Sequence, residues 1–150
     1  MDVLRAFRRL KPLPGGTWLF SRAVCRVAPY FSSIAPQVEA LEPGMARVTM
    51  RKRRAVQNHI KTVHAIAMCN MAELAGGLMT DVSIPKGARW IPVGMTVEYL
   101  KKAKTDLTAV ADGSGIDWSA VGNIQVPVVV TDTSGTPVFQ ARITMNVRHG

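Results

Sequence analysis

The sequence contains few of the residues that build disulfide frameworks or metal centres. It has 2 cysteines and 3 histidines in 150 residues. Cys25 and Cys69 lie in apolar, helix-forming context, and their spacing to His59, His64 and His149 matches no metal motif. We therefore expect two reduced thiols in the core, no structural metal, and a reducing, cytoplasmic location.

Acidic residues are also scarce, because 10 Asp and Glu stand against 19 Lys and Arg, which gives a net charge of +9. Such a charge predicts an anionic partner but leaves nucleic acid, an acidic membrane and a phosphorylated cofactor open. The basic run at 51–54 has neither the aromatic neighbours nor the motif of a nucleic-acid site. It is either a solvated strand end or a phosphate-contacting patch, and we expect no nucleic-acid partner.

Long hydrophobic runs are missing as well. The basic N-terminus is followed by prolines and glycines at 12–16 rather than by an uninterrupted apolar stretch, so we expect no cleaved secretory signal. The most apolar stretch, 65–79, is shorter than the about 20 residues of a bilayer span, so we expect no membrane insertion. With 47% hydrophobic and 19% charged residues, the composition is globular, and the length predicts a single domain over 1–150.

What the sequence does contain is one strongly apolar helical stretch. From Ala65 to Met79 only Asn70 and Glu73 are strongly polar, and no helix breaker stands before Gly76. A helix that is apolar all round is a buried one, so this stretch predicts the central helix of the core. A carboxylate in such a helix is costly unless it is paired or used, which makes Glu73 the first candidate for function.

Alternating apolar and polar residues predict strands on both sides of this helix. Gln37–Leu41 and 45–51 flank a Pro-Gly turn and predict a hairpin, and later alternating runs begin at Val93, Leu107, Val126 and Phe139. Short turns between consecutive strands imply antiparallel pairing. The fold class is therefore α+β, with one curved antiparallel sheet around a long central helix.

Two further segments are predicted from their local patterns. Residues 17 to about 30 are expected to form an amphipathic helix with Thr17 as N-cap and with Leu19, Ala23 and Val27 along one stripe. Residues 81–92 contain two prolines and a glycine and are expected to form a loop.

The residues around the central helix carry a family resemblance. Asn58, His64 and Glu73 match, without a gap, the active-site signature of hotdog-fold acyl-CoA thioesterases of the phenylacetate-pathway type. That signature has an Asn, a His six residues later that is followed by two glycines, and an acidic residue nine residues after the His. The resemblance implies a hotdog core over 36–150, preceded by an N-terminal basic segment and helix at 1–35, and hydrolysis of a fatty or aromatic acyl-CoA.

The chain departs from the signature directly after the His, where Ala65-Ile66 replace the two glycines. In the family these glycines lie where backbone N–H groups at the helix start meet the thioester carbonyl. A side chain there crowds the approach of the thioester, although the backbone donors themselves remain. The departure resembles poorly characterised branches of the hotdog superfamily.

Elementary chemistry assigns roles to the same positions. A helix start supplies unpaired N–H groups and the positive end of a dipole, so the backbone near His64, Ala65 and Ile66 would polarise the carbonyl. Glu73 would act as nucleophile or general base, with Asn58 orienting the thioester or the water. The alternatives are a structural ion pair for Glu73, a turn or a cap for Asn58, and a helix cap or a hydrogen-bonded core histidine for His64.

Geometry then requires more than one copy of the chain. His64 and Glu73 are nine residues apart, which puts them on opposite sides of a straight helix about two and a half turns apart. A site that uses both residues therefore needs two subunits, as the resemblance to hotdog thioesterases also implies. We expect an obligate homodimer, or a homotetramer built as a dimer of dimers.

Other positions are assigned to the substrate. Gly76 and Gly77 indicate close approach of a backbone or of the acyl chain, with tight packing as the alternative. The phosphates of coenzyme A need cations, and no other cofactor is expected. The candidates for these phosphates are Arg53, Arg54, Lys101, Lys102 and Lys104.

Two other functions remain open from the sequence. A hotdog hydratase or dehydratase on acyl thioesters would also use a His and a carboxylate, but with another local pattern around its His. A non-catalytic acyl-CoA-binding protein would result if Ala65-Ile66 closed the catalytic approach.

Overall fold

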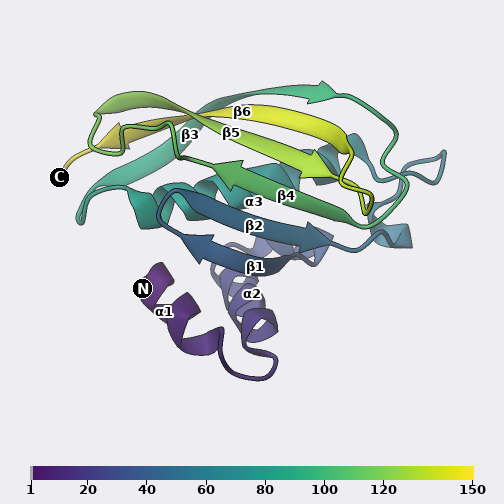
Figure 1. Cartoon of the computed structure of the whole chain (residues 1–150), viewed down its shortest axis with the longest axis horizontal. Helices are drawn as coiled ribbons and strands as arrows, with labels where there is room; N and C mark the ends of the chain where they lie inside the picture. The colour runs from purple at the N-terminus through teal and green to yellow at the C-terminus, as the bar shows by residue number, and fades with distance from the viewer. Residues whose placement is uncertain (1) are drawn as a thin grey trace.

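The computed structural model describes residues 2–150 and consists of an antiparallel sheet, a long helix against one face of it, and two short helices beside one edge (Figure 1). The elements in chain order are α1 (Val3–Leu10), α2 (Gly16–Val27), the 3-10 helix η1 (Pro29–Ile34), β1 (Gln37–Glu42), β2 (Met45–Met50), the 3-10 helix η2 (Arg54–Val56), α3 (Ala65–Ser83), β3 (Arg89–Tyr99), β4 (Leu107–Asp112), β5 (Gly122–Thr131) and β6 (Pro137–Arg148). These elements confirm the α+β class that the sequence predicts.

The helix α3 forms the centre of the core. Twelve of its residues are buried, and it begins at Ala65, where the apolar pattern predicts it. A Cβ at Gly76 would lie 2.9 Å from Cδ1 of Ile143 and 3.3 Å from Cγ1 of Val126. The glycine therefore allows α3 to lie close against β5 and β6, so that the packing alternative describes Gly76.

The sheet has the strand order β1-β2-β4-β5-β6-β3, and all of its pairs are antiparallel. Alternate residues of each inner strand point to α3 and are buried, as the pattern from Phe139 to Val147 in β6 predicts. The hairpin at 37–50 is also confirmed. The sheet curves over α3 (Figure 1).

The strand β3 differs from the others because it lies at the edge, and only Trp90 and Val97 on its inner face are half-buried against the core. None of its residues is buried, and Ile91 and Tyr99 are 61% and 54% exposed. Its residues at Met95, Val97 and Tyr99 pair in register with buried residues of β6, so they belong to the face that the core should cover. A long, largely exposed apolar edge strand is the kind of surface that pairs with another chain.

The N-terminal region corrects two sequence predictions and adds the helix α1, which lies in the segment that the sequence describes only as basic. The N-cap of α2 is Gly15 in the left-handed conformation (φ 69°), not Thr17, whose hydroxyl accepts a hydrogen bond from Nε2 of Gln37 at 2.7 Å. The predicted stripe is also wrong, because α2 buries Phe20 and Val24 while Leu19 and Val27 are exposed.

The predicted loop at 81–92 is mostly regular structure. Helix α3 continues to Ser83, and β3 already begins at Arg89. Pro92 is tolerated because β3 is an edge strand with a register irregularity between Pro92 and Gly94. No helix within residues 2–150 has the length and apolar character needed to cross a membrane.

Candidate active site

The loop before α3 is organised by the side chain of Asn58. Its Oδ1 accepts from the backbone N–H groups of Ile60 at 3.1 Å and Thr62 at 3.0 Å, and its Nδ2 donates to Oγ1 of Thr62 at 2.8 Å. These bonds hold a tight turn in which Lys61 adopts a left-handed conformation (φ 62°). Asn58 therefore shapes the loop that leads into α3, and one N–H of its amide is left over for another acceptor.

His64 is the N-cap of α3. Its Nδ1 accepts from the backbone N–H of Ile66 at 3.0 Å, and its own backbone N–H donates to the carbonyl of Val56 at 2.8 Å. These bonds use two of the three backbone donors that the sequence analysis assigns to the thioester carbonyl. Within residues 2–150, no acceptor takes the N–H of Ala65. The free donor at the positive end of α3 is therefore the N–H of Ala65. His64 caps the helix, which is one of the alternatives given for it from the sequence.

A pocket of about 460 Å³ opens at this helix start. Its lining includes Asn58, Ala65, Tyr99, Lys101 and Lys102. The Tyr99 hydroxyl lies 3.9 Å from Sγ of Cys69, and this contact raises the pKa of Tyr99. The pocket thus combines a free backbone donor with two lysines, a suitable setting for an anionic or polarised group. We call it the donor pocket.

Glu73 lies in a second pocket, of about 270 Å³, whose walls are almost entirely apolar. It lies between α2 and η1 on one side and α3 and β3 on the other, with Leu74, Phe31 and Trp90 in its walls. Among the described residues, none hydrogen-bonds the Glu73 side chain, so the alternative of a structural ion pair is not formed among them. A half-buried carboxylate beside an apolar cavity is free to act on a molecule bound there. We call this cavity the apolar pocket.

Gly77 and Asp81 fix the far wall of the apolar pocket through Trp90. Oδ1 of Asp81 accepts from the indole N–H of Trp90 at 3.0 Å, and a Cβ at Gly77 would lie 2.9 Å from Cη2 of the same ring. Asp81 is thus committed to the indole, while Glu73 is not. The sequence analysis missed Trp90 and Asp81 because both fell in the predicted loop; the β-forming pair Trp90-Ile91 was the signal that could have extended β3.

The sequence-predicted site residues do not meet within one chain. Ala65 and Asn58 line the donor pocket, Glu73 and Gly77 line the apolar pocket, and His64 and Ile66 line a third depression of about 170 Å³. Glu73 lies about 12 Å along the helix axis from Ala65 at 1.5 Å per residue. Ile66 points outward, with 54% of its side chain exposed.

The residues predicted for the coenzyme A phosphates are also divided. Lys101 and Lys102 line the donor pocket. Nη2 of Arg53 donates to the backbone carbonyl of Ser33 at 3.0 Å, and Arg54 and Lys104 are exposed and line neither pocket. The structure therefore places two of the five cations beside the helix start.

Comparisons with known proteins agree with this architecture. The model of the family described as a domain of unknown function (DUF4442) matches residues 16–147. A solved structure named genomics APC5556 is 55% identical, with a TM-score of 0.91 over the full length of both chains. No curated protein matches the sequence.

More distant structures share the fold. PA5026 from Pseudomonas aeruginosa, described as a protein of unknown function and probable thioesterase, is 23% identical with a TM-score of 0.77 over 92% of this chain and 97% of its own. The thioesterase HI1161 from Haemophilus influenzae is 15% identical with a TM-score of 0.72 over 80% of this chain and 82% of its own. At these identities the likeness extends to the fold and no further.

Proposed function

We propose that this chain, which belongs to the family described as a domain of unknown function (DUF4442), is an acyl-CoA thioesterase with a single hotdog domain. The observation that carries the proposal is Glu73, a carboxylate on the central helix at the wall of an apolar pocket, with no hydrogen-bond partner among residues 2–150. The thioesterase neighbours with the same fold support it as an analogy. The two free cysteines fit the predicted cytoplasmic location.

The site is shared between two copies of the chain. Tyr99, in the donor pocket, and Trp90, in the apolar pocket, stand near opposite ends of β3. If two exposed β3 edges pair antiparallel about a two-fold axis, the Tyr99 end of one copy lies beside the Trp90 end of the other. The donor pocket of one subunit then adjoins the apolar pocket of its partner, which joins Ala65 of one copy to Glu73 of the other.

The chemistry follows from the groups that this pairing brings together. The N–H of Ala65 holds the thioester carbonyl oxygen and stabilises the negative charge that develops on it. Glu73 takes a proton from water while the water oxygen bonds to the carbonyl carbon, and the C–S bond then breaks. The thiolate of coenzyme A takes the proton back, which restores the carboxylate; attack by Glu73 itself through an anhydride is the other route.

The two pockets would bind different parts of the substrate, the acyl group and coenzyme A. The apolar pocket, with Phe31, Leu74 and Trp90, receives the acyl group, and its volume of about 270 Å³ is near the lower end of small-molecule sites. This favours an aromatic or short fatty acyl group over a long one. Lys101 and Lys102 beside the helix start bind phosphates of coenzyme A, which enters as part of the substrate.

The testing experiment is thiol release from a panel of short, long and aromatic acyl-CoAs. We expect turnover on at least one short or aromatic substrate, and its loss in Glu73→Ala. Glu39→Ala, which removes an exposed carboxylate on β1, is the matched control and should keep full activity. Turnover that survives Glu73→Ala would refute the assignment of this residue.

One observation favours a second function, a non-catalytic acyl-CoA-binding protein. His64 already occupies the Ile66 N–H, so a single backbone donor remains at the helix start. Tight binding of an acyl-CoA without thiol release, by a folded dimer, would establish this alternative.

A further inference from the structure

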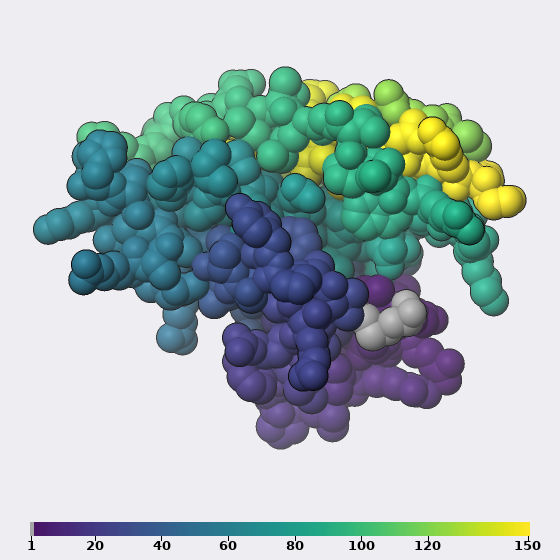
Figure 2. Space-filling view, turned by 180° about the vertical axis from the view of Figure 1, so that it is seen from behind, coloured from purple at the N-terminus to yellow at the C-terminus, as the bar shows by residue number. Residues whose placement is uncertain are grey.

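The two N-terminal helices form a hairpin that projects from the sheet. Figure 1 and Figure 2, which view the molecule from opposite sides, both place the turn between α1 and α2 at the extremity farthest from the sheet. Gly15 adopts φ 69°, and a Cβ at Gly16 would collide with the carbonyl oxygen of Leu10. These glycines allow the tight turn and the close approach of the two helices. The turn, which we call the tip, therefore has a fixed conformation.

Apolar side chains at this tip point to solvent. Leu13 in the turn is 55% exposed, and Trp18 in the first turn of α2 is 58% exposed. The buried face of α2, with Phe20 and Val24, already packs against the core. The exposed side chains of Leu13 and Trp18 are therefore not part of the core. Large apolar side chains on a projecting tip indicate a surface that contacts something other than water.

The charge around these side chains is of one sign. The basic residues near the turn are Arg8, Arg9, Lys11 and Arg22, and the only carboxylate in residues 2–36 is Asp2. Oδ1 of Asp2 accepts from the N–H of Arg5 at 3.0 Å and caps α1. The guanidinium of Arg22 lies 5.8 Å from the ring of Trp18, so cationic and aromatic groups are interleaved.

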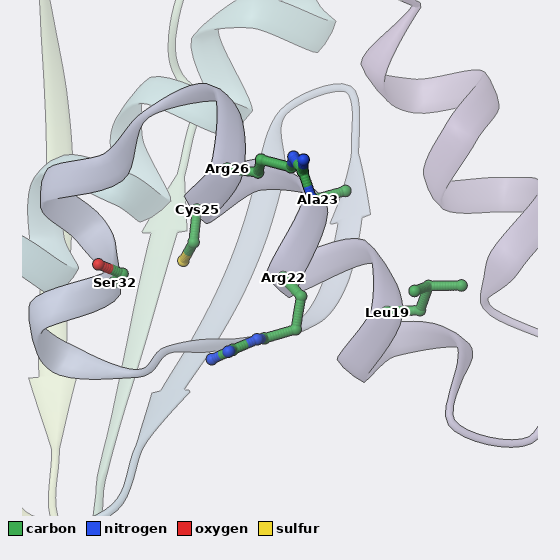
Figure 3. A pocket seen from close by; sticks show the side chains of 6 residues that line it. All are labelled: Leu19, Arg22, Ala23, Cys25, Arg26 and Ser32. Carbon is green, nitrogen blue, oxygen red and sulfur yellow. The ribbon is translucent and has the colours of Figure 1, made fainter.

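An arginine-lined depression continues this surface along α2. Arg22 and Arg26 project from the helix around an open hollow of about 460 Å³ that Cys25 and Ser32 also line (Figure 3). In Figure 3 the two guanidinium groups point to different sides of the hollow, so each is available to a separate anionic group. We call the tip and this depression together the N-terminal basic face, defined by Arg8, Arg9, Lys11, Leu13, Trp18, Arg22 and Arg26.

We propose that the N-terminal basic face docks the protein on an anionic phospholipid membrane surface. The guanidinium and ammonium groups bind headgroup phosphates, while Leu13 and Trp18 enter the boundary between headgroups and acyl chains. A second copy of the same face is a poor occupant because it would bring like charges together. Nucleic acid would satisfy the charges but would leave Leu13 and its apolar neighbours unburied.

The test is flotation with lipid vesicles, without substrate, which makes it independent of thioester hydrolysis. Wild-type protein should float with vesicles that contain phosphatidylglycerol and phosphatidylcholine, and not with phosphatidylcholine alone. Arg22→Glu/Arg26→Glu should weaken binding at least about tenfold, since each basic residue at an anionic surface contributes on the order of a fivefold change. Leu13→Ser/Trp18→Ser should weaken it while leaving the charge unchanged.

The matched control is Arg47→Glu/Arg142→Glu, which makes the same charge change on exposed positions of β2 and β6. It should bind vesicles within about twofold of wild type if the face is specific. Equal loss in the control, or no flotation of folded wild-type protein, would overturn the proposal. The proposal would also be overturned if duplex DNA or free phosphate bound the N-terminal basic face as tightly as the vesicles do. A change of oligomeric state in the variants of this face would overturn it too.

Discussion

At the scale of single residues, the backbone N–H of Ala65 can be removed by one substitution, which tests its role as a donor to the thioester carbonyl. Ala65 is the first residue of the helix, a position at which proline fits because its missing N–H is an orphan there. His64 has φ −63° and ψ 138°, which a following proline also allows. Ala65→Pro therefore removes the donor without breaking the helix.

We expect Ala65→Pro to reduce the rate of thiol release by about 10²–10³-fold, the usual cost of one oxyanion donor. Its thermal unfolding should match that of wild type. Ala65→Ser, which keeps the N–H, serves as control and should retain most of the activity. An active Ala65→Pro variant would remove the helix start from the mechanism.

Gly77 allows a second prediction at this scale. A Cβ there would press on the Trp90 ring at 2.9 Å, and Asp81 limits how far the indole can yield. Gly77→Ala should therefore shrink the apolar pocket and raise KM for the bulkiest accepted acyl-CoA more than for the smallest. Gly115→Ala is the control, because a Cβ there meets nothing within 4 Å, and it should leave the ratio of the two KM values unchanged. If Gly77→Ala also leaves this ratio unchanged, the apolar pocket does not bind the acyl group.

The residues of the site differ in how well sequence could predict them. The positions of Glu73 and Ala65 on α3 follow from the apolar pattern and the matched spacing. The bonds of Asn58 and the cap formed by His64 do not, because they depend on loop geometry that residue types leave open. The clamp on Trp90 depends on a contact between the end of α3 and β3, which no local pattern encodes.

At the scale of elements, β3 is the strand through which we propose that two copies pair. Its Met95 lies near the middle of the strand, is 38% exposed, and is in register with buried Ile143. Met95→Lys should convert the dimer to monomers, because a charge in an apolar strand interface is left without a partner. Sedimentation velocity measures this, and thiol release should fall with the dimer fraction.

Val121→Lys is the control for this change, because Val121 is also exposed but lies outside the strands. It should remain dimeric and active. A Met95→Lys protein that stays dimeric would show that the β3 edge is not the interface.

The turn between β5 and β6 allows a prediction about pH. The hydroxyl of Ser134 and the backbone N–H groups of Thr136 and Ser134 hold the pKa of Asp132 below its ordinary value. A lowered pKa in the folded state stabilises the fold above the unfolded-state pKa of about 4, and this is lost as the pH falls through the folded-state value. Asp132→Asn should thus be less stable than wild type at pH 7, and the gap should narrow below about pH 4 in denaturant titrations. A gap that is constant with pH would contradict this.

Elements were predictable where their burial is one-sided. The strands around Val48, Ala109, Val128 and Ile143 alternate because one face meets α3, so their patterns identified them. The pattern predicts the wrong face of α2, because Leu19 and Val27 are apolar without being buried. The start of β3 was missed because an edge strand tolerates Pro92, which a central strand would not.

At the scale of the whole molecule, the central claim is that each active site is built by two chains. The donor pocket and the apolar pocket are apart in one chain, and antiparallel pairing of β3 edges would join them across subunits. The claim predicts that two different inactive copies can restore each other. In a mixed dimer of Ala65→Pro and Glu73→Ala, both changes fall in one site, and the other site is intact.

The measurement that tests this most directly is thiol release by such mixed dimers, isolated with a different affinity tag on each chain. With shared sites, the mixed dimer should have about half the activity of wild-type dimers, because one of its two sites is complete. The two single-variant dimers should be nearly inactive under the same conditions. If the mixed dimer is as inactive as they are, Ala65 and Glu73 act within one chain and the shared site is wrong.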